Sequence, residues 1–318
     1  MKKQINWVVV VALIMVAVST LTFGWKINEN KDQYVENSNI ETTLRNNMNK
    51  FSGEFTIRNT KNIANLNNSR DYIMNQFKKC GYEIKVQQFD NEGVNVSNII
   101  AIKKGSRQSS GTIVVGAPYF SGNRPSVDAS DTGISAILTI ADQMKNLSCT
   151  YDIEFVAFAN SEKPYTSSEN IGSKIYVNSI KDKQSNIKGA VILDCIGYYT
   201  NTILTQRYPF MGVGYPNKGN FLAAMGDSNS KSFNDDFVAK FKKKSSFPIV
   251  QTNSNKILGA SKEDNYSFWQ AKIPAVLLTD TGIYRYEDLY TKRDTKDKLN
   301  YKAMSEIINN ITSSLSNY

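Results

Sequence analysis

The sequence of 318 residues contains no histidine. Histidine is the side chain most used as a general base near neutral pH and the commonest protein ligand of zinc. Its absence excludes serine–histidine catalysis, cysteine–histidine catalysis and every zinc site that needs a histidine ligand. Only three cysteines occur, Cys80, Cys149 and Cys195, and none lies in a CxxC pair. Neither a disulfide framework nor a thiolate zinc site is therefore predicted.

Glycine and proline are also scarce, with 18 and 7 residues, which excludes collagen-like and low-complexity chains. Hydrophobic residues make up 41% and charged residues 21%, so the chain is globular. Its formal net charge of +9 suits an anionic partner such as a membrane surface or a wall polymer, but a lysine-rich solvated surface is the favoured interpretation. No nucleic-acid motif accompanies the basic run over residues 240–244, and no nucleic-acid partner is predicted.

The N-terminus carries the longest apolar run of the chain. Lys2 and Lys3 precede residues 7–23, which contain no charged side chain. This length lies between that of a transmembrane helix and that of a signal-peptide core. Because the chain stays apolar beyond the candidate cleavage site at residues 17–19, an uncleaved transmembrane helix within residues 1–25 is favoured, and a secreted protein is the alternative. The predicted location is the cell membrane, single-pass, with the C-terminal domain extracytoplasmic.

The rest of the chain divides into a polar stalk over residues 26–49 and one folded domain over residues 50–318. In the domain, apolar runs typical of strands alternate with amphipathic segments typical of helices. This alternation predicts an α/β fold of three layers, αβα, around a mostly parallel central sheet. Sites in such folds lie at the carboxyl ends of the strands. Three predicted strand ends are followed by acidic side chains: Asp128, Glu162 and Asp194.

Seven short motifs follow one another along residues 55–316. They lie at residues 81–101, 115–117, 128–133, 155–158, 172–173, 193–198 and 266–281. In order and spacing they resemble the M28 zinc aminopeptidases. The resemblance implies a zinc-exopeptidase-like fold with a cocatalytic pair of zinc ions. It also implies that two histidines, a bridging aspartate, a glutamate and a second aspartate bind the zinc ions, and that another glutamate is the general base.

Only part of this site carries over to the present sequence. The resemblance matches Asp128 with the bridging aspartate, Glu162 with the glutamate ligand and Asp194 with the second aspartate ligand. Pro118 stands where the family has its first histidine, and Phe120 replaces an aspartate that orients the metal site. Because proline offers no electron pair to a metal, one zinc ion would lose its nitrogen ligand.

The remaining positions depart as well. Ser161 occupies the place of the general base, and Tyr290 that of the final histidine. Asp264 is kept, but Asn265 follows it where the family commonly has histidine. Tyrosine binds a metal only as the phenolate, which is costly to form near pH 7 from a reference pKa of about 10. The chain is therefore predicted to be a pseudopeptidase without zinc or any other cofactor.

The leading hypothesis is a catalytically inactive, membrane-anchored interaction or scaffold module whose unknown protein partner lies in the membrane or cell envelope. The alternative is an active metallohydrolase or aminopeptidase that uses the remaining carboxylates with a hard cation such as magnesium, calcium or manganese. A third possibility is a surface protein that binds polyanions. Two carboxylates 4 Å apart repel by about 4 kcal/mol at an effective dielectric near 20, so a raised pKa or a donor such as Tyr290 or Ser161 is expected to balance the retained acids.

Overall fold

The computed structural model describes residues 37–106, 111–161, 165, 168–208, 215–243, 245–254 and 263–318. The predicted membrane helix within residues 1–25 lies outside these residues, as does Glu162. Within the part of the chain that is described, no helix is both long enough and apolar enough to cross a membrane.

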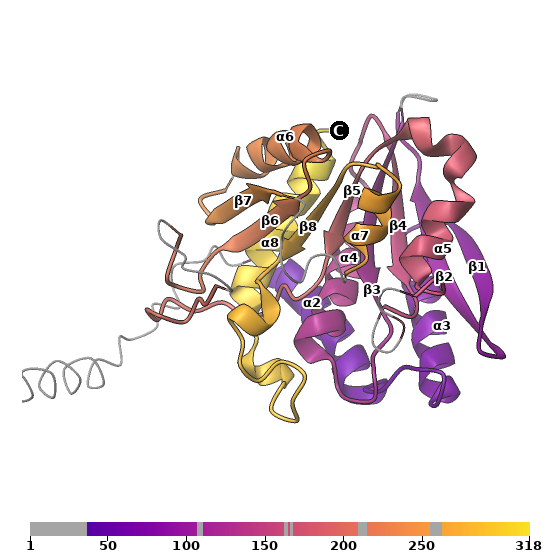
Figure 1. Cartoon of the computed structure of the whole chain (residues 1–318), viewed down its shortest axis with the longest axis horizontal. Helices are drawn as coiled ribbons and strands as arrows, with labels where there is room; N and C mark the ends of the chain where they lie inside the picture. Colours follow the sequence, from indigo (N-terminus) through magenta and orange to yellow (C-terminus); the bar gives the residue numbers. More distant parts are fainter. Residues whose placement is uncertain are drawn as a thin grey trace, which may run out of the picture.

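An eight-stranded sheet forms the middle of the domain, in the order β1-β2-β4-β3-β5-β8-β6-β7 (Figure 1). The strands are β1 Glu83–Asn91, β2 Val94–Lys103, β3 Thr112–Pro118, β4 Asp152–Phe158, β5 Ile187–Leu193, β6 Leu222–Gly226, β7 Ile249–Asn253 and β8 Ala275–Thr279. The central strands β4, β3, β5 and β8 are parallel, whereas β2 and β6 join them antiparallel. β3, β5 and β8 are apolar along most of their length, as expected of strands covered on both faces. The predicted α/β class and mostly parallel sheet are thereby confirmed.

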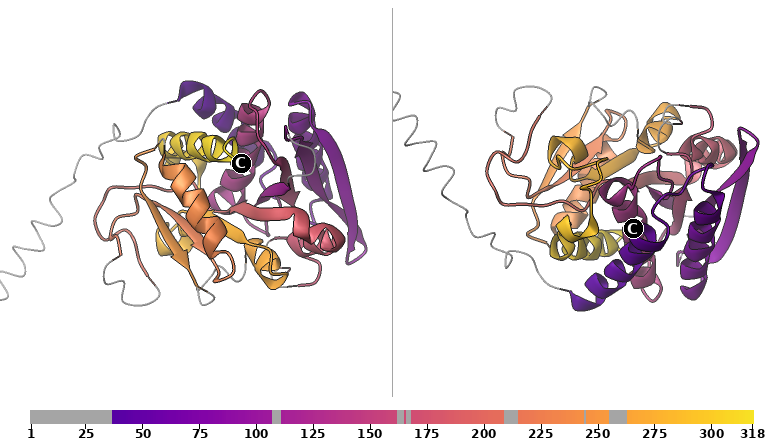
Figure 2. Two further views of the ribbon diagram at one scale, coloured as in Figure 1. Left: turned by 90° about the horizontal axis from the view of Figure 1, so that it is seen from above. Right: turned by 90° about the horizontal axis from the view of Figure 1, so that it is seen from below.

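Helices cover both faces of the sheet, which gives the expected three layers (Figure 2). One hydrophobic core joins the sheet to α2 Ser38–Asn49, α3 Ile63–Lys79, α4 Thr132–Met144, α6 Lys231–Lys242 and α8 Tyr301–Leu315. A second core joins the other face to α5 Gly172–Ser179 and α7 Asn265–Gln270. Helix α4 is apolar almost all round because α2 and α8 cover the side that turns away from the sheet.

The polar segment before the domain is shorter than predicted. Helix α2 buries Ile40, Leu44 and Met48 against α4 and α8, although the sequence suggested a stalk up to residue 49. These three residues are four apart, so they form one apolar stripe in an otherwise asparagine-rich helix. The folded domain therefore begins before residue 50.

Candidate functional site

The carboxyl ends of β3, β4, β5 and β8 meet at one edge of the sheet, here called the carboxyl edge. Pro118 is the last residue of β3 and pairs with Phe158 of β4. Phe120 is buried, and its ring lies 6.3 Å from that of Tyr165, centroid to centroid. The two rings line a cavity of about 500 Å³ together with Asn59, Thr60, Lys61, Glu92, Gly122 and Asn123. Neither Pro118 nor Phe120 offers a metal ligand.

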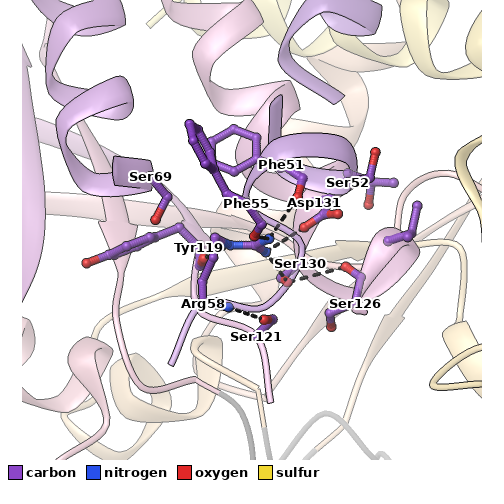
Figure 3. Close-up of polar contacts among 12 residues, drawn as sticks. Phe51, Ser52, Phe55, Arg58, Ser69, Tyr119, Ser121, Ser126, Ser130 and Asp131 are labelled. Atoms are coloured by element: carbon purple, nitrogen blue, oxygen red, sulfur yellow. Dashed lines mark hydrogen bonds and ion pairs between the residues drawn. The ribbon is translucent and has the colours of Figure 1, made fainter. Parts of the chain in front are cut away.

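A fully buried arginine supports this edge, as Figure 3 shows. The acceptors of the Arg58 guanidinium are the carbonyls of Phe51, Phe55 and Tyr119, the hydroxyl of Ser130 and the carboxylate of Asp131. Arg58 Nη2 lies 2.5 Å from Asp131 Oδ1, and Arg58 Nε lies 2.6 Å from the Tyr119 carbonyl oxygen. Because Tyr119 follows β3 and Asp131 ends the turn Val127–Asp131, Arg58 ties these two segments together. We call Arg58, Tyr119, Ser130 and Asp131 the Arg58 cluster.

Asp128 lies in the same turn and is also fully buried. Its Oδ1 accepts a hydrogen bond from the Gly197 backbone at 2.9 Å, and its backbone N–H donates to Asp294 Oδ2 at 3.3 Å. Among the described residues, Asp128 Oδ2 is buried and has no hydrogen-bond partner. Burial, followed by the charges of Asp280 and Asp294, raises the pKa of Asp128 well above its ordinary value. We call Asp128, Asp280 and Asp294 the carboxylate cluster, in which burial and the neighbouring carboxyl groups disfavour the ionised form of Asp128.

A second member of this cluster, Asp280, directly follows β8. Its two oxygens accept from the backbone N–H groups of Tyr198 at 2.7 Å and Gly282 at 2.8 Å. Burial raises the pKa of Asp280, but the positive charge of Arg285 and the two backbone donors oppose that effect. Arg285 itself is buried and donates from Nε to Gln206 Oε1 at 2.9 Å. The charge of Arg285 thus offsets part of the repulsion among the carboxyl groups of the cluster.

Ser161 and Asp264 form a second pair at the carboxyl edge. Ser161 Oγ lies 3.0 and 2.8 Å from the two carboxylate oxygens of Asp264, to which it donates. Asp264 immediately precedes α7, whose first residue is the buried Asn265. Burial raises the pKa of Asp264 to about 7, against the effect of hydrogen bonds from Ser173 and Ser161. The hydroxyl at the position matched to the family's general base is thus engaged by a buried carboxyl group.

Asp194 directly follows β5 and accepts a hydrogen bond from Cys195 Sγ at 3.1 Å. Burial, followed by the charges of Asp194, Asp128 and Asp280, raises the pKa of the Cys195 thiol. Asp194 and the carboxylate cluster therefore face the same side chain. Tyr290 is 39% exposed, and its carbonyl accepts from Arg124 Nη1 at 3.3 Å. Of the residues matched to the family's ligands, the structure thus brings Asp128 and Asp194 to one place.

Asp280, Asp294 and Arg58 were not singled out from the sequence. Asp280 follows a strand directly, so the strand-end reasoning that selected Asp194 also applies to it. Asp294 accepts from the backbone N–H groups of Val127 and Asp128 across 167 and 166 residues of sequence, and nothing local indicates such a pairing. The same holds for the contact between Arg58 and Asp131, 73 residues apart.

These residues do not fit a pair of zinc ions. Pro118 supplies no ligand atom, and Asp128 Oδ1 already accepts a hydrogen bond from the Gly197 backbone. A carboxyl group coordinates a metal in its ionised form, which burial and the neighbouring carboxyl groups disfavour for Asp128. Within the described ranges, no group of three or more cysteine, aspartate or glutamate side chains is arranged to hold a metal ion.

Comparison with known proteins agrees with the motifs in the sequence. The sequence model of Peptidase family M28 matches residues 98–315. The chain belongs to peptidase family M28. A related chain is YfbL of Escherichia coli (strain K12), an uncharacterized protein that is 27% identical over 272 residues, covering 82% of the present chain and 83% of YfbL.

Solved structures share the fold of this M28 domain. The LapA aminopeptidase of Legionella pneumophila has a TM-score of 0.66 at 15% identity, over 91% of this chain and 77% of LapA. The glutaminyl cyclase of Fimbriiglobus ruber has a TM-score of 0.60 at 16% identity, over 91% of this chain and 96% of the cyclase. At such low identity these likenesses establish the fold alone.

Proposed function

We propose that this M28 domain is catalytically inactive and serves as a membrane-anchored interaction module outside the cytoplasm. The observation that carries the proposal is the state of Asp128, the residue matched to the bridging ligand. It is fully buried, its Oδ1 accepts a hydrogen bond from the Gly197 backbone, and burial and the charges of Asp280 and Asp294 raise its pKa well above the usual range. A carboxyl group in this state stabilises the protein internally, and a pair of metal ions would require its ionised form.

The other matched positions support the same conclusion. Activation of water by a metal needs a nearby base, a role worth roughly 10²- to 10⁴-fold in rate. The only polar atom of the Ser161 side chain donates to Asp264. With no histidine in the chain, no other residue can restore the missing nitrogen ligand. The general base and the nitrogen ligand of the family's mechanism are therefore both missing from this chain.

The membrane part of the proposal rests on sequence. Residues 7–23 are apolar and uncharged, and Lys2 and Lys3 favour retention of the N-terminus on the cytoplasmic side. The partner is expected to be a protein of the membrane or the cell envelope. Fractionation should place the full chain in the membrane pellet, and crosslinking in the native cell should capture its partner. A mature chain that starts near Thr20 would contradict the anchor.

Loss of catalysis is tested by measuring zinc content and hydrolysis of aminoacyl anilides by the full chain. We expect neither in the wild type. The triple variant P118H/S161E/Y290H returns the matched residues to the family's types. Its control, P118A/S161Q/Y290F, changes the same three positions without introducing histidine or glutamate. We expect zinc uptake in the first triple variant only. Hydrolysis by the wild type that depends on magnesium, calcium or manganese would overturn the proposal in favour of an active metallohydrolase.

A further inference from the structure

Exposed apolar side chains gather at one part of the carboxyl edge. Four of the nine large apolar side chains that are exposed in the described residues lie there, on the segments that join β5 to β6 and follow β8. They are Ile203, Leu204, Tyr215 and Ile283, with exposed fractions of 46%, 79%, 45% and 55%. We call these four residues the loop patch. Of the other five, Tyr290 also follows β8, whereas Ile63, Val86, Leu147 and Tyr266 lie on four other parts of the chain. A patch of this kind calls for an explanation.

Direct contacts join the segments that carry the loop patch, which lie side by side in Figure 1. Ile203 forms a β-bridge with Lys218. The ring of Tyr208 lies 5.4 Å from that of Tyr215, centroid to centroid. Arg207 crosses to the segment after β8, where its Nη2 donates to the carbonyl of Ile283 at 2.8 Å. The four side chains therefore belong to one surface.

Leu204 is held in an exposed position by its neighbours. Its φ of 62° is in the left-handed region, which non-glycine residues adopt at a cost of roughly 1 kcal/mol or more. The next residue fixes the turn, because Thr205 Oγ1 donates to the Thr202 carbonyl at 2.7 Å and accepts from the Gly219 backbone at 3.0 Å. The local structure thus presents the leucine to solvent, where it contributes nothing to the core.

The surroundings of the loop patch carry an excess of positive charge. The charged side chains with access to solvent on these segments are Arg207, Lys218, Lys292, Arg293, Lys296 and Lys298, against Glu287, Asp288 and Asp297. Arg207 pairs with Glu287 at 2.7 Å, and Arg293 with Asp288 at 2.5 Å. Among the described residues, no carboxylate forms an ion pair with Lys218 or Lys292, so both remain open to an anionic group.

We infer that the loop patch docks on an anionic phospholipid surface. Aliphatic side chains and tyrosine beside lysine are what the interface of a bilayer accepts, and anionic head groups complement the positive charge. The proposed membrane anchor, on which this inference rests, holds the domain near the bilayer. The apolar run ends at residue 23 and the described domain begins at residue 37, so the connection spans no more than about 50 Å. The domain is thereby kept close to the bilayer whatever path the connection takes.

Docking in this orientation turns the carboxyl edge toward the lipid. In this fold the edge holds Asp128, Asp194 and Ser161, so the surface that a peptide substrate would approach is partly covered. The opposite edge and the two helical layers are then left for a protein partner. The orientation is therefore compatible with an interaction module and unfavourable for a peptidase.

The test uses the full chain reconstituted in vesicles that contain phosphatidylglycerol with brominated acyl chains, which quench tryptophan fluorescence on contact. The variant L204W places a reporter in the loop patch. The matched control is L147W, because Leu147 is 41% exposed and lies between α4 and β4, at the opposite edge of the sheet. We expect quenching beyond the wild-type level for L204W alone, and its loss when phosphatidylcholine replaces phosphatidylglycerol. Equal quenching in the two variants would overturn the inference and assign the loop patch to a protein partner.

The native Trp7 and Trp25 separate failure of the inference from failure of the anchor. If they are quenched while L204W adds nothing, the anchor stands and the docking surface does not. If they are not quenched, the anchor fails, and sedimentation of the chain with added vesicles decides the loop patch alone. In that assay L204S/I283S should lower the vesicle-bound fraction about tenfold or more, since each buried aliphatic side chain contributes strongly to transfer from water. Unchanged binding of this double variant would also overturn the inference.

Discussion

The Arg58 cluster and the carboxylate cluster each bury an aspartate, and they accommodate its carboxyl group in different ways. Asp131 and Asp128 lie three residues apart in one turn, and both are fully buried. Asp131 has a permanent cation against it, Arg58 Nη2 at 2.5 Å, whereas Asp128 faces two other carboxyl groups, and burial and their charges raise its pKa. The fold therefore provides a cationic partner for the acid that fixes the backbone. It provides none in contact with Asp128, the position matched to a family metal ligand, among the described residues.

The largest expected effect follows from removing the cation of the Arg58 cluster. R58M leaves Asp131 buried without its partner and deprives the carbonyls of Phe51, Phe55 and Tyr119 of their donor. Breaking a buried ion pair on one side costs about 3–5 kcal/mol. Urea denaturation should show this loss of unfolding free energy.

The control for R58M is R45M. Arg45 forms an exposed pair with Glu41 at 2.6 Å on α2, and such pairs are worth less than about 1 kcal/mol. If R58M and R45M lose similar amounts of unfolding free energy, the Arg58 cluster does not organise the edge as described.

Replacement of Asp131 and of Asp128 by asparagine should have different effects on the unfolding free energy. D131N at pH 8 leaves the guanidinium of Arg58 without a negative partner, and we expect a loss of about 2–3 kcal/mol of unfolding free energy. D128N replaces a carboxyl group whose ionised form is disfavoured by a neutral amide, so stability at pH 8 should be equal or higher. The measurement is thermal and urea unfolding of both variants side by side. A loss in D128N as large as that in D131N would mean that Asp128 is ionised and paired in a way the structure does not show.

The sequence indicated the acidic residues that follow strands better than it indicated the residues that pair with them from distant loops. Strand-end reasoning selected Asp128, Glu162 and Asp194 because apolar runs locate buried parallel strands well. Asp128 and Asp194 lie at the carboxyl edge, and Glu162 lies outside the described residues. The same reasoning did not indicate Asp294 or Arg58, because their partners lie 166 and 73 residues away. Pairings between loops depend on how the layers pack, and no local pattern encodes them.

Two elements were missed for local reasons. The short strand β6, with the sequence Leu-Ala-Ala-Met-Gly, has little β-propensity and was not predicted as a strand. It forms because β7 and β8 pair with it on either side. Helix α2 was assigned to a stalk because asparagine and other polar residues dominate it, although Ile40, Leu44 and Met48 already form a helical stripe.

A smaller effect is expected in the pH dependence of stability. Burial raises the pKa of Asp264 and of Asp294 to about 7, so the folded chain binds protons that the unfolded chain releases from about pH 4 upward. Their contribution to stability is complete below that pH and is lost as the pH rises through 7. D264N removes one of these groups and should flatten the fall in unfolding free energy between pH 5 and pH 8 by about 1 kcal/mol or more.

The control for D264N is D236N. Despite the partial burial of Asp236, hydrogen bonds from Lys240 and Tyr318 lower its pKa, so this residue contributes stability that is lost as the pH falls. D236N should therefore leave the slope between pH 5 and pH 8 unchanged. A wild-type chain that becomes more stable over this interval would contradict the assignment of protons to Asp264 and Asp294.

The smallest expected effect is that of metal ions on the carboxylate cluster. A ligand at 100 times its dissociation constant stabilises a protein by about 2.7 kcal/mol, which raises the melting temperature of a domain of this size by several degrees. We expect EDTA, zinc, calcium and manganese at micromolar concentration to shift the wild-type melting temperature by less than about 1 °C, because a cation needs the ionised form of Asp128, which burial and the neighbouring carboxyl groups disfavour. That effect weakens as the pH rises, so melts at pH 6 and at pH 8.5 sharpen the comparison, with D128N as the variant that lacks the ionisable group. Stabilisation by several degrees at pH 8.5 in the wild type and not in D128N would show that the cluster exchanges a proton for a cation, and would restore the active metallohydrolase as the better account of this chain.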